Sequence, residues 1–273
     1  MVAAFAGWND AASAATTALE AVAVGLDSEI VARIDPEEYF DFQVNRPTIR
    51  LVEGRTRRID WPSTTVIAAR VPAAERDLIL LSGTEPNLRW RGFSTAVLDA
   101  AERMKVEMVV TLGALIADVA HTRPVPITGL ASDEQLVERL GLSRSHYEGP
   151  TGIVGVLHEA CRRRDIPSAS LWAAVPHYVA AVPNPKAALA LLRRLESLTG
   201  IVVEASELEE AMERFDAQVD EAVAANPEIR ELVERLESEQ EETLEPGADV
   251  PSGDALAREF QRFLRQRGDK PDQ

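Results

Sequence analysis

The amino-acid sequence predicts a layered α/β domain with a largely parallel sheet that extends to about residue 200. Apolar runs alternate along the chain with amphipathic segments, which is the rhythm of strands joined by helices. The runs at 108–112 and 168–175 are continuously apolar, as expected of strands that are buried on both faces. Each of these runs leads to a polar cluster, and ligands bind at the carboxyl ends of strands in open α/β sheets.

The chain begins with a short apolar strand at 2–6, the turn Gly7-Trp8-Asn9-Asp10 and an alanine-rich helix at 11–24. Asp10 is placed to cap that helix, because a carboxylate accepts the free N–H groups at a helix start and suits its positive end. Further along, the aromatic residues within 35–61 indicate a packed hairpin or cover.

The remaining core elements follow from apolar periodicity and from capping residues. The central strand at 108–112 is bounded by Gly113, and a helix lies between Asn184-Pro185 and Gly200, as cap and stop. Further strands are predicted at 29–34, 64–71, 77–81 and 168–175, with 64–71 and 77–81 as an antiparallel pair; further helices are predicted at 93–105, at 133–140 and from Gly149-Pro150-Thr151-Gly152 to Arg164.

The chain changes character after residue 200. Ser206-Glu207-Leu208-Glu209 matches a capping box, and Asn226-Pro227 restarts a second helix, so an acidic helical hairpin is expected. A Pro/Gly-rich linker at 245–253 leads to a last amphipathic helix, which carries Leu256, Phe260, Phe263 and Leu264. We therefore expect a core domain at 1–200, a helical appendage at 201–267 and a frayed tail at 268–273.

The negative charge is concentrated in this appendage. Of the formal net charge of −16, residues 204–245 carry 16 acidic residues against three arginines, or −13, which leaves −3 elsewhere. No basic face for DNA or RNA is present. The single cysteine, Cys161, cannot form an intrachain disulfide, and no signal peptide or run of about 18 apolar residues is found. We expect a cytoplasmic protein with no nucleic-acid or membrane partner.

Candidate ligand-binding residues cluster at the predicted strand ends. The turn Gly7-Trp8-Asn9-Asp10 can offer backbone N–H groups to an anion, or it can be a capped turn with Trp8 packed on the sheet. Gly83 and Glu85 lie in a polar loop at 82–87, and Gly113 ends the central strand. Arg123 is an anion ligand or the structural partner of Asp118 or Glu85. Together with His121, these residues are expected to converge on one cleft.

Candidate catalytic residues are His121 or His177 as the proton carrier and Asp10 or Glu85 as its orienting carboxylate. The competing interpretation is that these side chains are simply hydrogen-bonded. His146 and His158 lack metal-ligand spacing and are expected at the surface or in the core, so no metal site is predicted. No phosphate loop, dinucleotide fingerprint or nucleophile elbow occurs, and no cofactor is expected.

Several motifs closely resemble the proteasome-assembly-chaperone family, in its second-chaperone branch of the actinobacterial and archaeal type. The motifs are Gly7-Trp8-Asn9-Asp10-Ala11, Gly83-x-Glu85-Pro86, Trp90-Arg91-x-Phe93, the run from Gly113 to Pro126 with His121-Thr122-Arg123-Pro124, Gly149-Pro150-x-Gly152-Ile153 and Pro176-His177-Tyr178. The resemblance covers about residues 1–200 and implies a three-layer α/β/α sandwich of the phosphorylase/hydrolase-like type, commonly assembled as a trimer.

The resemblance favours a protein that acts by protein–protein interaction, in assembly or scaffolding. The alternative is a small-molecule enzyme, a hydrolase, phosphorylase or ATP-dependent carboxylate–amine ligase that uses the strand-end cleft. We prefer the first function, because the chain shows no nucleophile, metal or nucleotide motif and a fold does not imply a reaction. The acidic hairpin is expected to be a partner surface or an oligomer-mediating arm, or else a solvated face.

Overall fold

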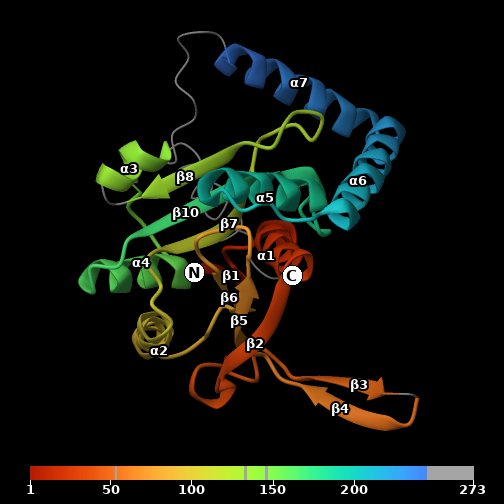
Figure 1. The fold of residues 1–273 in the computed structure, drawn as a ribbon. Helices are drawn as coiled ribbons and strands as arrows, with labels where there is room; N and C mark the ends of the chain where they lie inside the picture. Colours follow the sequence, from red (N-terminus) through yellow and green to blue (C-terminus); the bar gives the residue numbers. More distant parts are fainter. Residues whose placement is uncertain (53, 132–133, 145–146, 245–273) are drawn as a thin grey trace.

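The fold is known from a computed structural model, which describes residues 1–273 except 53, 132–133, 145–146 and 245–273. A mostly parallel eight-stranded sheet forms its centre, in the order β2-β5-β6-β1-β7-β10-β8-β9 (Figure 1). The strands are β1 (Val2–Ala6), β2 (Asp27–Ile34), β5 (Thr64–Arg70), β6 (Leu78–Thr84), β7 (Val109–Ala117), β8 (Ile127–Ala131), β9 (Ser143–Arg144) and β10 (Ser168–Pro176).

The first strand of the chain occupies a central position in this sheet. β1 pairs in parallel with β6 on one side, through Val2 and Leu80, and with β7 on the other, through Val2 and Val110. β7 and β10 are parallel over their whole length. The antiparallel pair that the sequence predicted is confirmed as β5 and β6, and β2 pairs antiparallel with β5 at the sheet edge.

Helices cover both faces of the sheet, which confirms the three-layer α/β/α sandwich. Successive side chains of β1 point to opposite faces, because a strand has a period of two. Val2 and Ala4 therefore pack in the layer of α1 (Ala14–Gly25) and α5 (Pro185–Thr199). Ala3 and Phe5 pack in the layer of α2 (Trp90–Arg103) and α4 (Ile153–Arg163). A further short helix, α3 (Glu134–Leu140), follows β8.

The local signals at α5 act as the sequence predicted. The Asn184 side chain accepts a hydrogen bond from the Ala187 backbone N–H at 2.9 Å, and Pro185 is the first helical residue. Gly200 is the C-cap and closes the helix. The apolar residues on one side of α5 are buried against α1 and the sheet.

Three predictions about elements were wrong in detail. The central strand continues through Gly113 to Ala117. The α-helix predicted at 11–24 begins as a 3-10 turn at Ala11–Ser13, because Ala12 and Ser13 have left-handed φ angles of 51° and 53°. The capping box at Ser206 does not form, since Ala205 precedes the helix without a side-chain cap and Glu204 accepts the Ser206 N–H instead. β8 and β9 were not predicted.

The segment from 35 to 61 forms the expected hairpin, but most of it is not packed. A 3-10 turn, η2 (Pro36–Glu38), leads to buried Phe40, whereas β3 (Thr48–Val52) and β4 (Thr56–Asp60) form a separate two-stranded sheet that is largely exposed. Figure 1 shows this sheet projecting from the body of the molecule.

The acidic hairpin is confirmed as α6 (Ser206–Ala225) and α7 (Pro227–Leu244). Leu208 of α6 packs into the core layer that contains α5, and Val233 and Leu236 of α7 pack near Ala120. None of the helices in the described ranges is long and apolar enough to span a membrane. The predicted last helix, with Leu256, Phe260, Phe263 and Leu264, and the tail at 268–273 lie outside the described residues.

Candidate functional site

Most of the predicted site residues follow four neighbouring parallel strands, β6, β1, β7 and β10. The turn at 7–10 follows β1, Glu85 follows β6, His121 lies beyond β7, and His177 and Tyr178 lie in η3 (His177–Val179) after β10. They are therefore at the carboxyl edge of the sheet, the edge at which open α/β sheets generally bind ligands. Their side-chain contacts sort them into two groups. Within the part of the chain that the structure describes, no hydrogen bond joins Glu85 to His121.

The first group connects the turn after β1 to the start of α4. Glu85 Oε1 accepts hydrogen bonds from Asn9 Nδ2 at 3.3 Å and from the Ile153 backbone N–H at 2.7 Å. The carboxylate thus lies at the amino terminus of a helix, where a negative charge is favourable. Gly7 has a φ angle of +132°, and a Cβ atom there would lie 3.3 Å from Glu85 Cβ, so the turn and this carboxylate fit closely together.

Asp10 binds the start of α1, as the structural interpretation expected. Its Oδ1 accepts hydrogen bonds from the Ala15 N–H at 2.7 Å and the Thr16 N–H at 3.3 Å, and its Oδ2 accepts one from the Thr16 hydroxyl. Burial raises the pKa of Asp10, and these hydrogen bonds oppose the rise. The same interpretation had suggested that Trp8 packs on the sheet. Trp8 is instead among the exposed residues, with 38% of its surface accessible.

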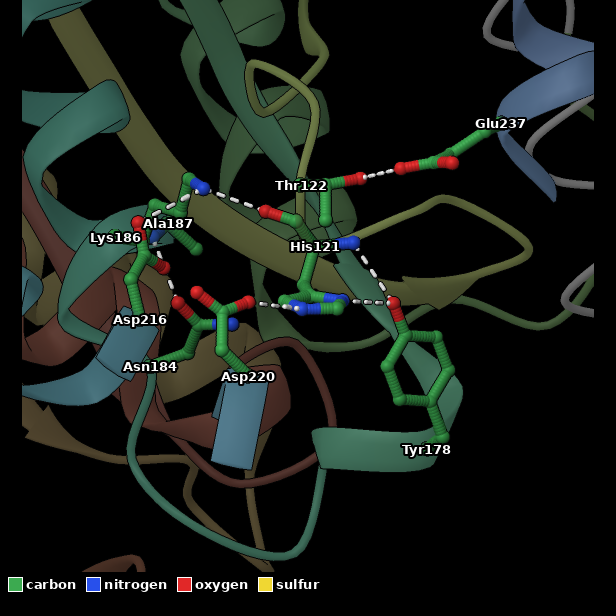
Figure 2. Close-up of polar contacts among 9 residues, drawn as sticks. All are labelled: His121, Thr122, Tyr178, Asn184, Lys186, Ala187, Asp216, Asp220 and Glu237. Atoms are coloured by element: carbon green, nitrogen blue, oxygen red, sulfur yellow. Dashed lines mark hydrogen bonds and ion pairs between the residues drawn. The ribbon is translucent and has the colours of Figure 1, made fainter. Parts of the chain in front are cut away.

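The second group lies under the acidic hairpin and is centred on His121 (Figure 2), which is 4% exposed. The Tyr178 hydroxyl oxygen accepts a hydrogen bond from the His121 backbone N–H at 2.7 Å and lies 2.7 Å from His121 Nδ1. His121 Nε2 lies 3.1 Å from Asp220 Oδ1 on α6. Because the Tyr178 oxygen already accepts one hydrogen bond, its own proton is available to Nδ1. The network then places the single ring proton of neutral His121 on Nε2, which donates to Asp220.

Further polar contacts fasten the hairpin to the sheet edge. Lys186 Nζ donates to the His121 carbonyl oxygen at 2.5 Å and lies 3.0 Å from Asp216 Oδ2 on α6. The Thr122 hydroxyl donates to Glu237 on α7. We call the contacts of His121, Thr122 and Lys186 with the two helices the hairpin clasp (Figure 2). Burial and the nearby charge of Glu237 raise the pKa of Tyr178 to about 12, so this tyrosine stays protonated.

The other predicted residues take less central places. His177 Nδ1 lies 2.9 Å from Asp118 Oδ1, so Asp118 is in contact with a histidine. Gly83 lies within β6, paired with Phe5 and Thr64, and is therefore not in a loop. Gly113 lies within β7 rather than at its end, and a Cβ atom there would come within 2.6 Å of the Trp172 ring. The close approach of the Trp172 ring accounts for a glycine at position 113, and no ligand contact is needed to explain it. Arg123 is half-buried.

Sequence reasoning missed the residues that close the clasp. Lys186 follows a recognisable helix cap, but nothing in its neighbourhood indicated a contact with His121, 65 positions earlier. Asp216 and Asp220 were counted only as charges of an acidic hairpin. The one available signal was their place on α6, because both lie beside the apolar stripe of Phe215 and Val219 rather than opposite it.

Burial explains His158, while His146 lies outside the described residues. His158 Nε2 lies 2.9 Å from the Thr111 hydroxyl, and desolvation by the core lowers the pKa of this histidine to about 4. Cys161 is fully buried, as expected of a core residue, and burial raises the pKa of its thiol to about 11. No group of three or more potential metal ligands was found in the described ranges.

The His158→Gln variant is expected to be less sensitive to acid than the wild type. Between about pH 6.5 and pH 4 the unfolded chain protonates His158 whereas the native protein does not, so this group lowers the free energy of unfolding as the pH falls. Between pH 7 and pH 5, His158 lowers the free energy of unfolding of the wild type by about 1 to 2 kcal/mol. The glutamine variant lacks this contribution and should lose that much less stability over the same pH range. Urea unfolding of both proteins at the two pH values measures it, and equal losses would contradict the assignment.

Comparisons with known proteins agree with the resemblance that the sequence motifs suggested. The PAC2 family model matches residues 4–223. A PAC2 family protein from Streptomyces avermitilis is 49% identical, over 85% of this chain and 98% of its own, with a TM-score of 0.80. A proteasome-assembly chaperone homologue from Mycobacterium tuberculosis is 45% identical over the same shares, with a TM-score of 0.77.

More distant relatives share the fold. PbaB, an archaeal proteasome activator from Pyrococcus furiosus, is 16% identical over 81% of this chain and 92% of its own, with a TM-score of 0.66. A comparison with curated proteins returned no match. The family model covers most of the chain, and two solved structures are more than 40% identical to it over 85% of its length. The chain belongs to the PAC2 family.

Proposed function

We propose that this protein is a proteasome-assembly chaperone that acts in the cytoplasm by binding other proteins. One observation carries the proposal. The chain is 45% identical to a proteasome-assembly chaperone homologue, and the match covers 98% of that homologue's length. The homologue and this chain therefore share the whole α/β/α sandwich and not only a motif.

The contacts of the candidate catalytic residues support a binding role. Glu85 accepts two hydrogen bonds at the start of α4. Both ring nitrogens of His121 are occupied, by Tyr178 and by Asp220 of the hairpin. His177 forms an ion pair with Asp118 when it is protonated. Side chains whose polar atoms are satisfied in this way act first as parts of the fold.

The test is a reconstitution with proteasome subunits from the same organism. Purified α and β subunits are mixed with and without this protein, and assembled particles are followed by native electrophoresis and by peptidase activity. We expect faster appearance of particles and a complex with the α subunits that is stable to gel filtration. An equal mass of serum albumin is the control. Unchanged assembly, together with no complex at tens of micromolar, would overturn the proposal.

We further propose that the functional unit is a homotrimer. Light scattering is expected to give three times the chain mass of 29.8 kDa at micromolar concentration. Identical chains that bind one another through two different surfaces form a closed ring when the rotation between them allows it. A monomer mass at that concentration would rule out the trimer without affecting the reconstitution.

A further inference from the structure

The two-stranded sheet β3–β4, which we call the arm, has apolar side chains that the described part of the chain leaves exposed. Isolated two-stranded sheets are marginally stable in water, and they are usually packed against another element. Ile49 and Ile59 are direct cross-strand partners and therefore share one face. Leu51 lies on the same face, and the exposed fractions of Ile49, Leu51 and Ile59 are 58%, 64% and 49%.

The arm is also basic, in a chain that is strongly acidic. Four arginines and two acidic residues lie between 48 and 60. Arg50 and Arg58 both contact Asp60. Arg57 is the cross-strand partner of Leu51 and so lies at the end of the apolar face. Within the described residues, neither Arg55 nor Arg57 forms an ion pair. The arm therefore offers an apolar centre with the positive charges of Arg55 and Arg57 beside it.

The outward sides of α6 and α7 have complementary properties. Glu213, Ala217 and Glu221 are exposed and spaced four residues apart, so they form one stripe along α6. This stripe faces away from Phe215 and Val219, the residues that α6 buries. On α7, Glu228, Glu231 and Glu234 are exposed and at helical spacing. The small side chain of Ala217 leaves room between two carboxylates for an apolar side chain of a partner.

These two surfaces cannot meet within one molecule. Figure 1 shows the arm and the α6–α7 hairpin at opposite ends of the molecule, with the eight-stranded sheet between them. The hairpin is fastened in that position by the clasp at His121 and Lys186. Two unlike, complementary surfaces at opposite ends of one subunit are the requirement for head-to-tail association, which closes into a ring when the rotation allows it.

We propose that the arm of one copy of this protein docks on the outward face of the α6–α7 hairpin of a second copy. The apolar face with Ile49, Leu51 and Ile59 covers the stripe around Ala217. Arg55 and Arg57 pair with the carboxylates of α6 and α7. The inference rests on the homotrimer proposed above and assigns its interface.

The test is a charge exchange between the two surfaces. The arm variant is Arg55→Glu/Arg57→Glu, and the hairpin variant is Glu213→Lys/Glu221→Lys; none of these four side chains forms an ion pair in the described residues. Each variant alone places like charges opposite one another and should weaken self-association on the order of 100-fold. The protein that carries all four substitutions restores opposite charges and should associate again. Analytical ultracentrifugation at several concentrations measures this, and circular dichroism confirms the fold.

The control is Arg91→Glu/Arg103→Glu on α2, which changes the net charge by the same amount on exposed arginines of the body. It should leave self-association unchanged. A wild-type trimer that the arm variant leaves intact, or a fourfold variant that stays dissociated, would overturn the arm interface and leave the trimer standing. A monomeric wild type would overturn both, whereas the reconstitution with proteasome subunits would still test the chaperone function separately.

Discussion

Replacing Phe93 by alanine is expected to lower the free energy of unfolding by about 4 kcal/mol, the range typical of large aromatic residues deleted from a packed core. Phe93 is 0% exposed and lies in the layer between the sheet and α2. Its ring packs edge-on against Phe5 of β1, with centroids 5.9 Å apart, and against Tyr39, at 5.4 Å. The substitution removes both aromatic contacts and leaves a cavity that rigid strands cannot fill.

Urea unfolding at one fixed protein concentration measures this loss, because any oligomer makes the apparent stability depend on concentration. Phe42→Ala is the matched control. Phe42 is half-buried and packs on Trp61 at 4.8 Å near the base of the arm, outside the main core. Its loss should cost clearly less than that of Phe93. Equal losses for the two variants would show that the α2 layer is not packed as described.

Lys186→Met is expected to loosen the acidic hairpin by about 2 to 3 kcal/mol, the usual cost of removing the charged partner of a partly buried hydrogen-bonded group. Methionine keeps the apolar length of the side chain but leaves the His121 carbonyl and Asp216 without the ammonium that now contacts both. Asp216 Oδ1 is buried and already lacks a hydrogen-bond partner within the described residues. Its charge then has no nearby compensation.

Hydrogen exchange followed by mass spectrometry should show this change in α6, as protection lower by about 30-fold or more. Exchange in α4, which lies on the other face of the sheet, should stay the same. The control is Arg214→Met, since Arg214 forms an exposed pair with Glu210 at 3.5 Å, and such pairs contribute little. If both variants exchange alike in α6, Lys186 does not hold the hairpin.

The sequence predicted the elements whose signals are local. Asn184, Pro185 and Gly200 lie within a few residues of the helix ends that they define, so α5 was placed correctly. β8 was missed because its sequence, Ile127-Thr-Gly-Leu-Ala131, has little apolar alternation. It forms a strand because β10 lies alongside it, with Trp172 opposite Thr128. That pairing depends on residues about 40 positions away, which no local pattern shows.

The candidate site was predictable in position but not in arrangement. Glu85, His121 and His177 come after the strands β6, β7 and β10, which all run parallel to β1 in the sheet. Which side chains then meet depends on how α6 crosses the edge at which these strands end. Asp220 reaches His121 from 99 positions further along the chain. Gly113 was read as a strand end, since glycine usually interrupts strands, whereas the cause is the neighbouring Trp172 ring.

The central position of β1 has a consequence for the order of events during synthesis. β1 is made before its partners β6 and β7, which end at Thr84 and Ala117. At the usual rates of translation, on the order of ten seconds pass before both partners leave the ribosome. During that time the apolar strand Val2–Ala6 has no sheet to join. Folding of the sheet should therefore be slow, because the central contacts of β1 are distant in sequence.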